Sequence, residues 1–225
     1  MIAVGVDACR QGWVALAHRP GAALRATVVA ELGELEAAFP DAAGFGIDIP
    51  IGLPADHPRP ADLEARRVLG ARRSSVFVTP VRSALQAPTH REASERNRQR
   101  TGQGISQQAY ALRRKILEAE AWVARVPVPV WEVHPEVSFT MLTGHPASAS
   151  KRTWAGVHER LGALRAAGLE LGDLGDAGAR AGADDVIDAA LAAWSTHRLL
   201  LGRGRSWPDP PERDPATGRL VAIWA

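Results

Sequence analysis

Several acidic residues stand at positions where a lone charge is costly unless it is paired or bound to a metal. Asp7 ends the first apolar segment of the chain. Asp48 ends a later apolar segment, two residues before a proline. Asp185 and Asp188 are three residues apart at the start of an expected helix, so both project from one face. Glu132 lies in a further expected strand. These acids are candidates for catalysis, and the aspartates are candidate metal ligands.

Acids from two neighbouring strands and from a helix packed on them can converge on one point. Hard cations such as Mg²⁺ or Mn²⁺ prefer carboxylate oxygen. Two such ions about 4 Å apart would activate a water molecule and stabilise a leaving oxygen at phosphorus. The acids therefore predict metal-assisted phosphodiester hydrolysis.

Each acid also has a simpler interpretation. An aspartate at a strand end can be a turn residue, and acids in the first turn of a helix are favoured by the helix dipole. Asp184, at the start of the same expected helix, can be its cap. Glu136 follows Glu132 by four residues, and the spacing does not decide between these two as a ligand.

The segments that would position the acids alternate between strand and helix patterns. Three short apolar runs with tight turns open the chain, and a helix precedes a fourth strand, which together predict a mixed α/β sheet. The expected strands are 2–7, 12–17, 24–30, 45–48 and 128–133, and the expected helices around them are 31–39, 150–167 and 184–201. Residues 168–182 read as a linker, and 220–224 as an edge strand or a packed tail.

The middle of the chain is strongly basic. Residues 59–115 hold thirteen basic and four acidic residues, whereas the remainder holds 14 basic and 21 acidic ones, so a net charge of +2 conceals two opposite parts. Helices are expected at 62–69 and 106–123, with turn formers between them. Arginine and serine side chains are common partners of phosphate oxygens. The candidates are Arg72, Arg73, Ser75 and Arg82. A solvated helical surface is the alternative.

A specific combination of short motifs extends over nearly the whole chain. They are VGVD and GW at 4–7 and 12–13, GIDIPIGLP at 46–54, SSVFVTPVR at 74–82, GISQQAY at 104–110, KI at 115–116, EVHPEVSF at 132–139 and DDVIDA at 184–189. This set resembles domain-of-unknown-function family 429, described as a predicted nuclease with an RNase H-like fold. The order of the acids is also similar to that of the Holliday-junction resolvase branch of the RNase H-like superfamily.

The resemblance implies an α/β fold of the RNase H-like type. Its mixed five-stranded sheet is flanked by helices, with a basic helical insertion between the fourth and fifth strands. It implies a single domain over 1–225, with the insertion at about 55–125. The metal ligands would be Asp7, Asp48, Asp185 and Asp188, with Glu132 as an extra or alternative ligand. Gln107 and Lys115 would contact the substrate.

The remaining composition narrows the classes of protein. The single cysteine excludes an internal disulfide, and no signal peptide or membrane span is recognisable, so we expect a cytoplasmic protein. The leading hypothesis is a nuclease that acts on nucleic acid or a nucleotide and leaves a 5′-phosphate and a 3′-hydroxyl. The alternatives are a phosphotransferase of the sugar-kinase and actin type, and a non-catalytic nucleic-acid-binding protein.

Overall fold

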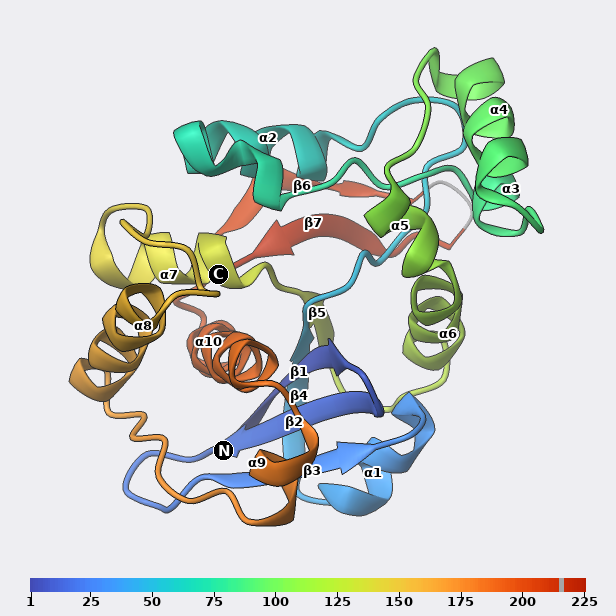
Figure 1. The fold of residues 1–225 in the computed structure, drawn as a ribbon. Helices are drawn as coiled ribbons and strands as arrows, with labels where there is room; N and C mark the ends of the chain where they lie inside the picture. Colours follow the sequence, from blue (N-terminus) through green and yellow to red (C-terminus); the bar gives the residue numbers. More distant parts are fainter. Residues whose placement is uncertain (215–216) are drawn as a thin grey trace. The chain divides into compact units, whose positions relative to one another are not determined.

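The computed structural model describes residues 1–214 and 217–225, which form two compact units. The first unit holds Met1–Ile49, Arg125–Arg205 and Trp224–Ala225, and the second holds Pro50–Ala124 and Ser206–Ile223. Figure 1 shows the elements of both units, coloured along the chain. The segment expected as a basic insertion lies in the second unit up to Ala124.

A mixed five-stranded sheet forms the centre of the first unit. Its strands are β1 Ile2–Cys9, β2 Gly12–His18, β3 Arg25–Val29, β4 Ala42–Ile47 and β5 Val130–Glu132. Their order is β3-β2-β1-β4-β5. The first three strands pair antiparallel, whereas β4 runs parallel to β1 and β5 parallel to β4. This sheet, with helices in the segment between β4 and β5, confirms the predicted fold class and is consistent with an RNase H-like arrangement.

The helices of the first unit are η1 Leu32–Glu34, α1 Leu35–Ala38, α7 Pro135–Thr143, α8 Trp154–Ala166, α9 Asp176–Arg180 and α10 Ala183–Leu200. They include α7, which was not expected, and the helix expected at 31–39 is divided into η1 and α1. The helix expected from residue 150 begins at Trp154, because the side chain of Thr153 caps it by accepting a hydrogen bond from the N–H of Gly156. The prediction of a linker at 168–182 was wrong in part, because this segment contains α9.

Helix α10 lies very close to the sheet, and two glycines permit this. Gly5 of β1 is the register partner of Gly46 of β4. A Cβ atom on Gly5 would lie 2.0 Å from the carbonyl oxygen of Ala189, and one on Gly46 would lie 2.1 Å from Oγ1 of Thr196. Both neighbours belong to α10, so this helix packs directly on the backbone of β1 and β4. Figure 1 shows α10 beside these strands, and α7 and α8 pack against it.

The second unit is mostly helical. Its elements are α2 Pro60–Leu69, η2 Gly70–Ser75, α3 Arg82–Leu85, α4 His90–Thr101, α5 Gln107–Ala111, α6 Arg113–Val123, and the two strands β6 Ser206–Arg213 and β7 Leu220–Trp224. The helix expected at 106–123 is divided at Leu112 into α5 and α6. Helix α4 was not expected. Residues 220–224 form a strand as expected, and it pairs with β6 in a two-stranded sheet.

A buried ion pair organises the start of α2. The guanidinium of Arg59 contacts the Asp62 carboxylate at 2.5 Å and donates hydrogen bonds to the carbonyl oxygens of Ile51 and Gly52. The backbone N–H of Thr79 donates to the same carboxylate at 2.7 Å. Both charged side chains are almost fully buried.

In the part of the chain that the structure describes, no helix has the length and apolar character to cross a membrane.

Candidate metal centre

The sheet and α10 determine where three aspartates lie. Asp7 and Asp48 each follow, by two residues, one of the glycines that contact α10, and side chains two residues apart along a strand share a face. Asp7 lies near the end of β1, and Asp48 directly follows β4. On α10, Asp188 precedes by one turn the buried residue Ala192, which also faces the sheet. The packing of Gly5 and Gly46 on α10 therefore brings the three carboxylates to one place.

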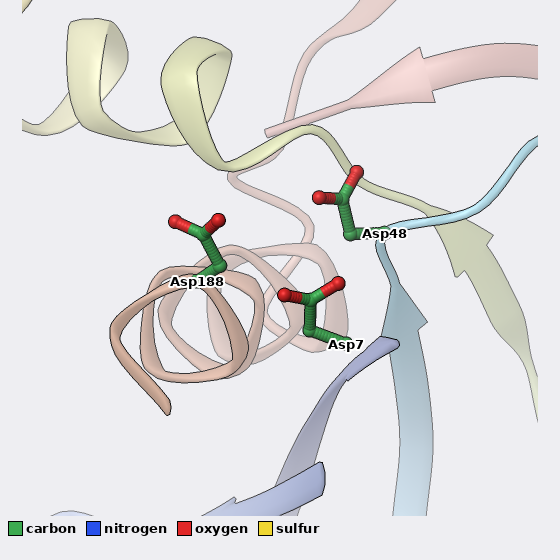
Figure 2. Close-up of side chains that lie close together, drawn as sticks. All are labelled: Asp7, Asp48 and Asp188. Carbon is green, nitrogen blue, oxygen red and sulfur yellow. The ribbon is translucent and has the colours of Figure 1, made fainter. Parts of the chain in front are cut away.

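The three side chains form a compact group. One carboxylate oxygen from each of Asp7, Asp48 and Asp188 lies within 4.8 Å of the others. Figure 2 shows the three carboxylates, from the end of β1, the end of β4 and one face of α10, gathered around a common space. Asp7 and Asp188 are 7% and 2% exposed, and Asp48 is partly buried. This spacing is suitable for one cation held by oxygen atoms.

The environment makes ionisation of all three carboxyl groups unfavourable. Burial, followed by the charges of Asp48 and Asp188, raises the pKa of Asp7 well above its ordinary value. Burial also raises the pKa of Asp48 and of Asp188 to about 7, although the charge of Lys151 opposes the shift in both. Near neutral pH the group therefore retains protons that a bound cation would displace.

Lys151 is the nearest positive charge to the three carboxylates. Lys151 lies in a turn just before α8, and its Nζ atom forms an ion pair with Oδ2 of Asp188. Burial lowers the pKa of Lys151, but the ion pair with Asp188 and the charges of Asp48 and Asp7 outweigh it and hold the pKa above its ordinary value. The other oxygen of Asp188, Oδ1, is buried and has no hydrogen-bond partner among the described residues. This oxygen is therefore available as a ligand atom.

A fourth carboxylate, that of Glu136, acts on the group from α7. Its charge contributes to the raised pKa of Asp48 and of Asp188. Its Oε1 atom accepts a hydrogen bond of 2.5 Å from the fully buried Arg160, which also stacks on Phe139. The charge of Glu136 therefore reaches Asp48 and Asp188.

The structure does not bring every candidate acid into the group. Glu132 is buried in β5 opposite Ile47, and it is not among the three residues whose ligand atoms lie together. Asp185 is half-buried in the first turn of α10 and is also outside the group. Its charge nevertheless adds to the raised pKa of Asp7. Both remain candidates on sequence grounds.

The candidate substrate contacts all lie in the second unit. Arg72, Arg73 and Ser75 belong to η2, where the hydroxyl of Ser75 donates to the carbonyl oxygen of Arg72. Arg82 forms a two-pronged ion pair with Glu120, so its charge is already partly balanced. Gln107 contacts His90 at 3.2 Å. Lys115 is half-buried in α6.

Two features of the centre were missed by sequence reasoning. One is Lys151, for which a signal existed: it is one of only two lysines among the 27 basic residues of the chain. The other is the pair of Arg160 and Glu136. Nothing local marks Arg160 as buried, because it lies in a helix whose polar and apolar residues show almost no segregation.

The donor set fits a divalent cation. All three ligand residues supply carboxylate oxygen, which hard cations prefer. Burial raises the pKa of each of the three acids, and a bound cation would favour their ionised forms. The buried carboxylates can thus hold a metal ion.

Comparison with known proteins is consistent with the sequence motifs. Searches of curated proteins and of solved structures each found no match. A family profile with the description "Protein of unknown function (DUF429)" matches residues 5–213. This range includes the three aspartates, Lys151 and the whole basic segment. The chain therefore belongs to the DUF429 family.

Proposed function

We propose that this protein is a nuclease that hydrolyses phosphodiester bonds with Mg²⁺ or Mn²⁺ held by Asp7, Asp48 and Asp188. The observation that carries the proposal is the convergence of three carboxylates within 4.8 Å from two strands and one helix. Such a group destabilises the metal-free fold. Strongly shifted pKa values in a cluster of this kind are typical of functional sites.

The residues of the centre would perform distinct tasks. A bound divalent ion would supply an activated water and stabilise negative charge on the phosphoryl oxygens. Asp7, Asp48 and Asp188 keep the ligand oxygens in position on a rigid sheet and helix, and their burial limits access of bulk water. In the hydrolysis, the water oxygen bonds to phosphorus while the P–O3′ bond breaks. The products are a 5′-phosphate and a 3′-hydroxyl, whose oxygen takes up a proton.

A nucleic acid substrate is supported by the basic segment. Three arginines of α2 and η2, Arg66, Arg67 and Arg73, together with Gly70 line a hollow of about 420 Å³. Arg66 is fixed there by a hydrogen bond of 2.7 Å to the carbonyl oxygen of Val76. No acid lines this hollow among the described residues, so it is suited to phosphate oxygens.

The first hairpin favours a hydrolase over a phosphotransferase. Cys9 pairs directly with Gly12, so only Arg10 and Gln11 form the turn between β1 and β2. A turn of two residues has no glycine-rich loop that could enclose the phosphates of a nucleotide.

Cleavage assays with Mn²⁺ test the proposal directly. We expect the wild-type protein to cut at least one of single-stranded, duplex, hybrid and branched substrates, and Asp7→Asn to abolish the cut. Asp41→Asn removes an exposed acid of the same unit and should retain activity. A wild-type protein that binds Mn²⁺ but cuts none of these substrates contradicts the proposal.

Binding measurements test the arginine hollow separately. The variant Arg67→Gln/Arg73→Gln should bind nucleic acid more weakly, with a slope of log affinity against log salt reduced by roughly 1.5 to 2, as expected for two lost phosphate contacts. Arg165→Gln/Arg203→Gln removes the same charge from exposed positions of the first unit and should leave the slope unchanged. If the two double variants show the same slope of log affinity against log salt, the arginine hollow is not the contact with nucleic acid.

A further inference from the structure

The two oxygens of Asp188 have different surroundings. Oδ2 forms the ion pair with Nζ of Lys151, whereas Oδ1 is buried without a hydrogen-bond partner among the described residues. A carboxylate can bridge two cations, one on each oxygen. One oxygen of Asp188 therefore already carries a cation, and the other is available for a metal ion.

The charges of the centre also indicate how many divalent ions it can hold. Asp7, Asp48 and Asp188 contribute three negative charges when ionised, and Lys151 supplies one positive charge in contact with Asp188. The remaining two negative charges match one divalent ion. With Lys151 present, a second divalent ion would leave the buried group with two excess positive charges, whereas without Lys151 it would leave only one, and excess buried charge is costly.

Glu132, Glu136 and Asp185 are left out of this count because they are not among the residues whose ligand atoms lie together. Glu136 is balanced by the fully buried Arg160, which contacts it at 2.5 Å. Asp185 is half-buried in the first turn of α10, where solvent and the helix N-terminus offset its charge.

We propose that Lys151 is the built-in second cation of this centre, so that the three aspartates take one divalent ion and not a pair. The inference rests on the proposed function only for the existence of the metal site, not for cleavage. It departs from the two-ion arrangement that the acids alone suggest. An ammonium group has three N–H donors. With one donor directed at Asp188, Lys151 can direct another at a phosphoryl oxygen and so take the place of a second ion.

The experiment counts bound metal ions. Mn²⁺ is titrated calorimetrically into EDTA-treated wild type and into Lys151→Met, and the spectra of the loaded proteins are recorded by electron paramagnetic resonance. We expect one ion in the wild type. In Lys151→Met we expect two ions and the spectrum of a spin-coupled pair, because the variant loses the competing charge. The first ion should also bind at least tenfold more tightly.

Two further variants keep the result interpretable. Lys151→Arg retains the charge and should bind one ion. Arg152→Gln removes the charge of the adjacent exposed residue and should behave as the wild type. Two ions in the wild type, or one ion of unchanged or weaker affinity in a folded Lys151→Met, would overturn the proposal. An absence of any Mn²⁺ binding by the wild type would overturn it together with the proposed function.

Cleavage plays no part in these measurements. A protein that binds one ion as wild type and two as Lys151→Met, yet cuts no nucleic acid, would keep this inference and lose the nuclease proposal. The two proposals can therefore fail independently.

Discussion

The backbone N–H of Asp48 donates a hydrogen bond of 2.9 Å to the carbonyl oxygen of Val6, the residue before Asp7. This bond continues the parallel ladder of β1 and β4 by one residue beyond the last strand residue of β4. Asp7 and Asp48 are thus held side by side by the backbone of the sheet. The repulsion between their carboxylates is imposed by the fold, and its consequences can be measured.

The first consequence concerns stability without metal. The pKa of Asp48 and of Asp188 rises from 3.8 to about 7 on folding, so between these values the folded protein holds protons that the unfolded chain has released. The free energy of unfolding due to these groups therefore falls as the pH rises through this window. We expect lower urea midpoints in EDTA at about pH 8 than at about pH 5.5, and Mn²⁺ should reverse the loss at the higher pH.

A variant isolates this effect from that of His18. Burial, followed by the charge of His197, lowers the pKa of His18 to about 4, so His18 contributes a stability change of the opposite sign between about 4 and 6.5. Asp48→Asn should be more stable than wild type in EDTA at about pH 8. The gain should be at least ~1 kcal/mol, because a pKa shift of one unit already corresponds to about 1.4 kcal/mol. It should also lose the stabilisation by Mn²⁺. Lower stability of Asp48→Asn than of wild type under these conditions contradicts the assigned electrostatics.

The second consequence is proton release on metal binding. Near pH 7, Asp48 and Asp188 are about half protonated in the metal-free protein. Mn²⁺ needs their ionised forms, so binding should release protons and weaken as the pH falls from about 8 to about 6. Calorimetry in buffers with different ionisation enthalpies measures the number of protons released. A binding enthalpy that is the same in all buffers at pH 7 would disprove this prediction.

The acids of the centre could be predicted because each leaves a local mark. Asp7, Asp48 and Asp188 each interrupt or end an apolar pattern in a strand or helix, and the strand order then directs them to one edge. Lys151 leaves no such mark. Its contact with Asp188 spans 37 residues and depends on the path of a turn before α8.

Element boundaries were harder to predict, because single side chains determine them. Capped by Thr153, α8 begins at Trp154, four residues after the expected start of the helix, and α4 begins where Thr89 accepts a hydrogen bond from the N–H of Glu92. Helix α4 is almost entirely polar, with only Ala93 and Asn97 buried, so it has no apolar period that could indicate it.

The buried ion pair of the second unit gives a third prediction. Asp62→Ala removes the Asp62 carboxylate from its contact with the Arg59 guanidinium, which is 3% exposed. Loss of one partner of a buried pair typically costs about 3–5 kcal/mol. We expect a corresponding fall in the urea midpoint. The double variant Arg59→Met/Asp62→Leu removes both charges but leaves the N–H of Thr79 without its acceptor, so it should recover only part of the loss. A double variant as unstable as Asp62→Ala would show that the lost hydrogen bonds, not the unpaired charge, determine the cost.

The last prediction tests whether the close packing of α10 positions the metal centre. Gly5→Ala would place Cβ 2.0 Å from the carbonyl oxygen of Ala189 and 2.1 Å from the backbone nitrogen of Ala193, so α10 must shift and carry Asp188 with it. We expect a loss of at least ~3 kcal/mol in unfolding free energy, and weaker Mn²⁺ binding in the fraction that folds. Gly162→Ala, in α8, has nothing within 4 Å. It should stabilise the protein by ~0.5–1 kcal/mol and leave Mn²⁺ affinity unchanged. Normal Mn²⁺ affinity in Gly5→Ala would mean that the glycine contact does not hold Asp188 in place.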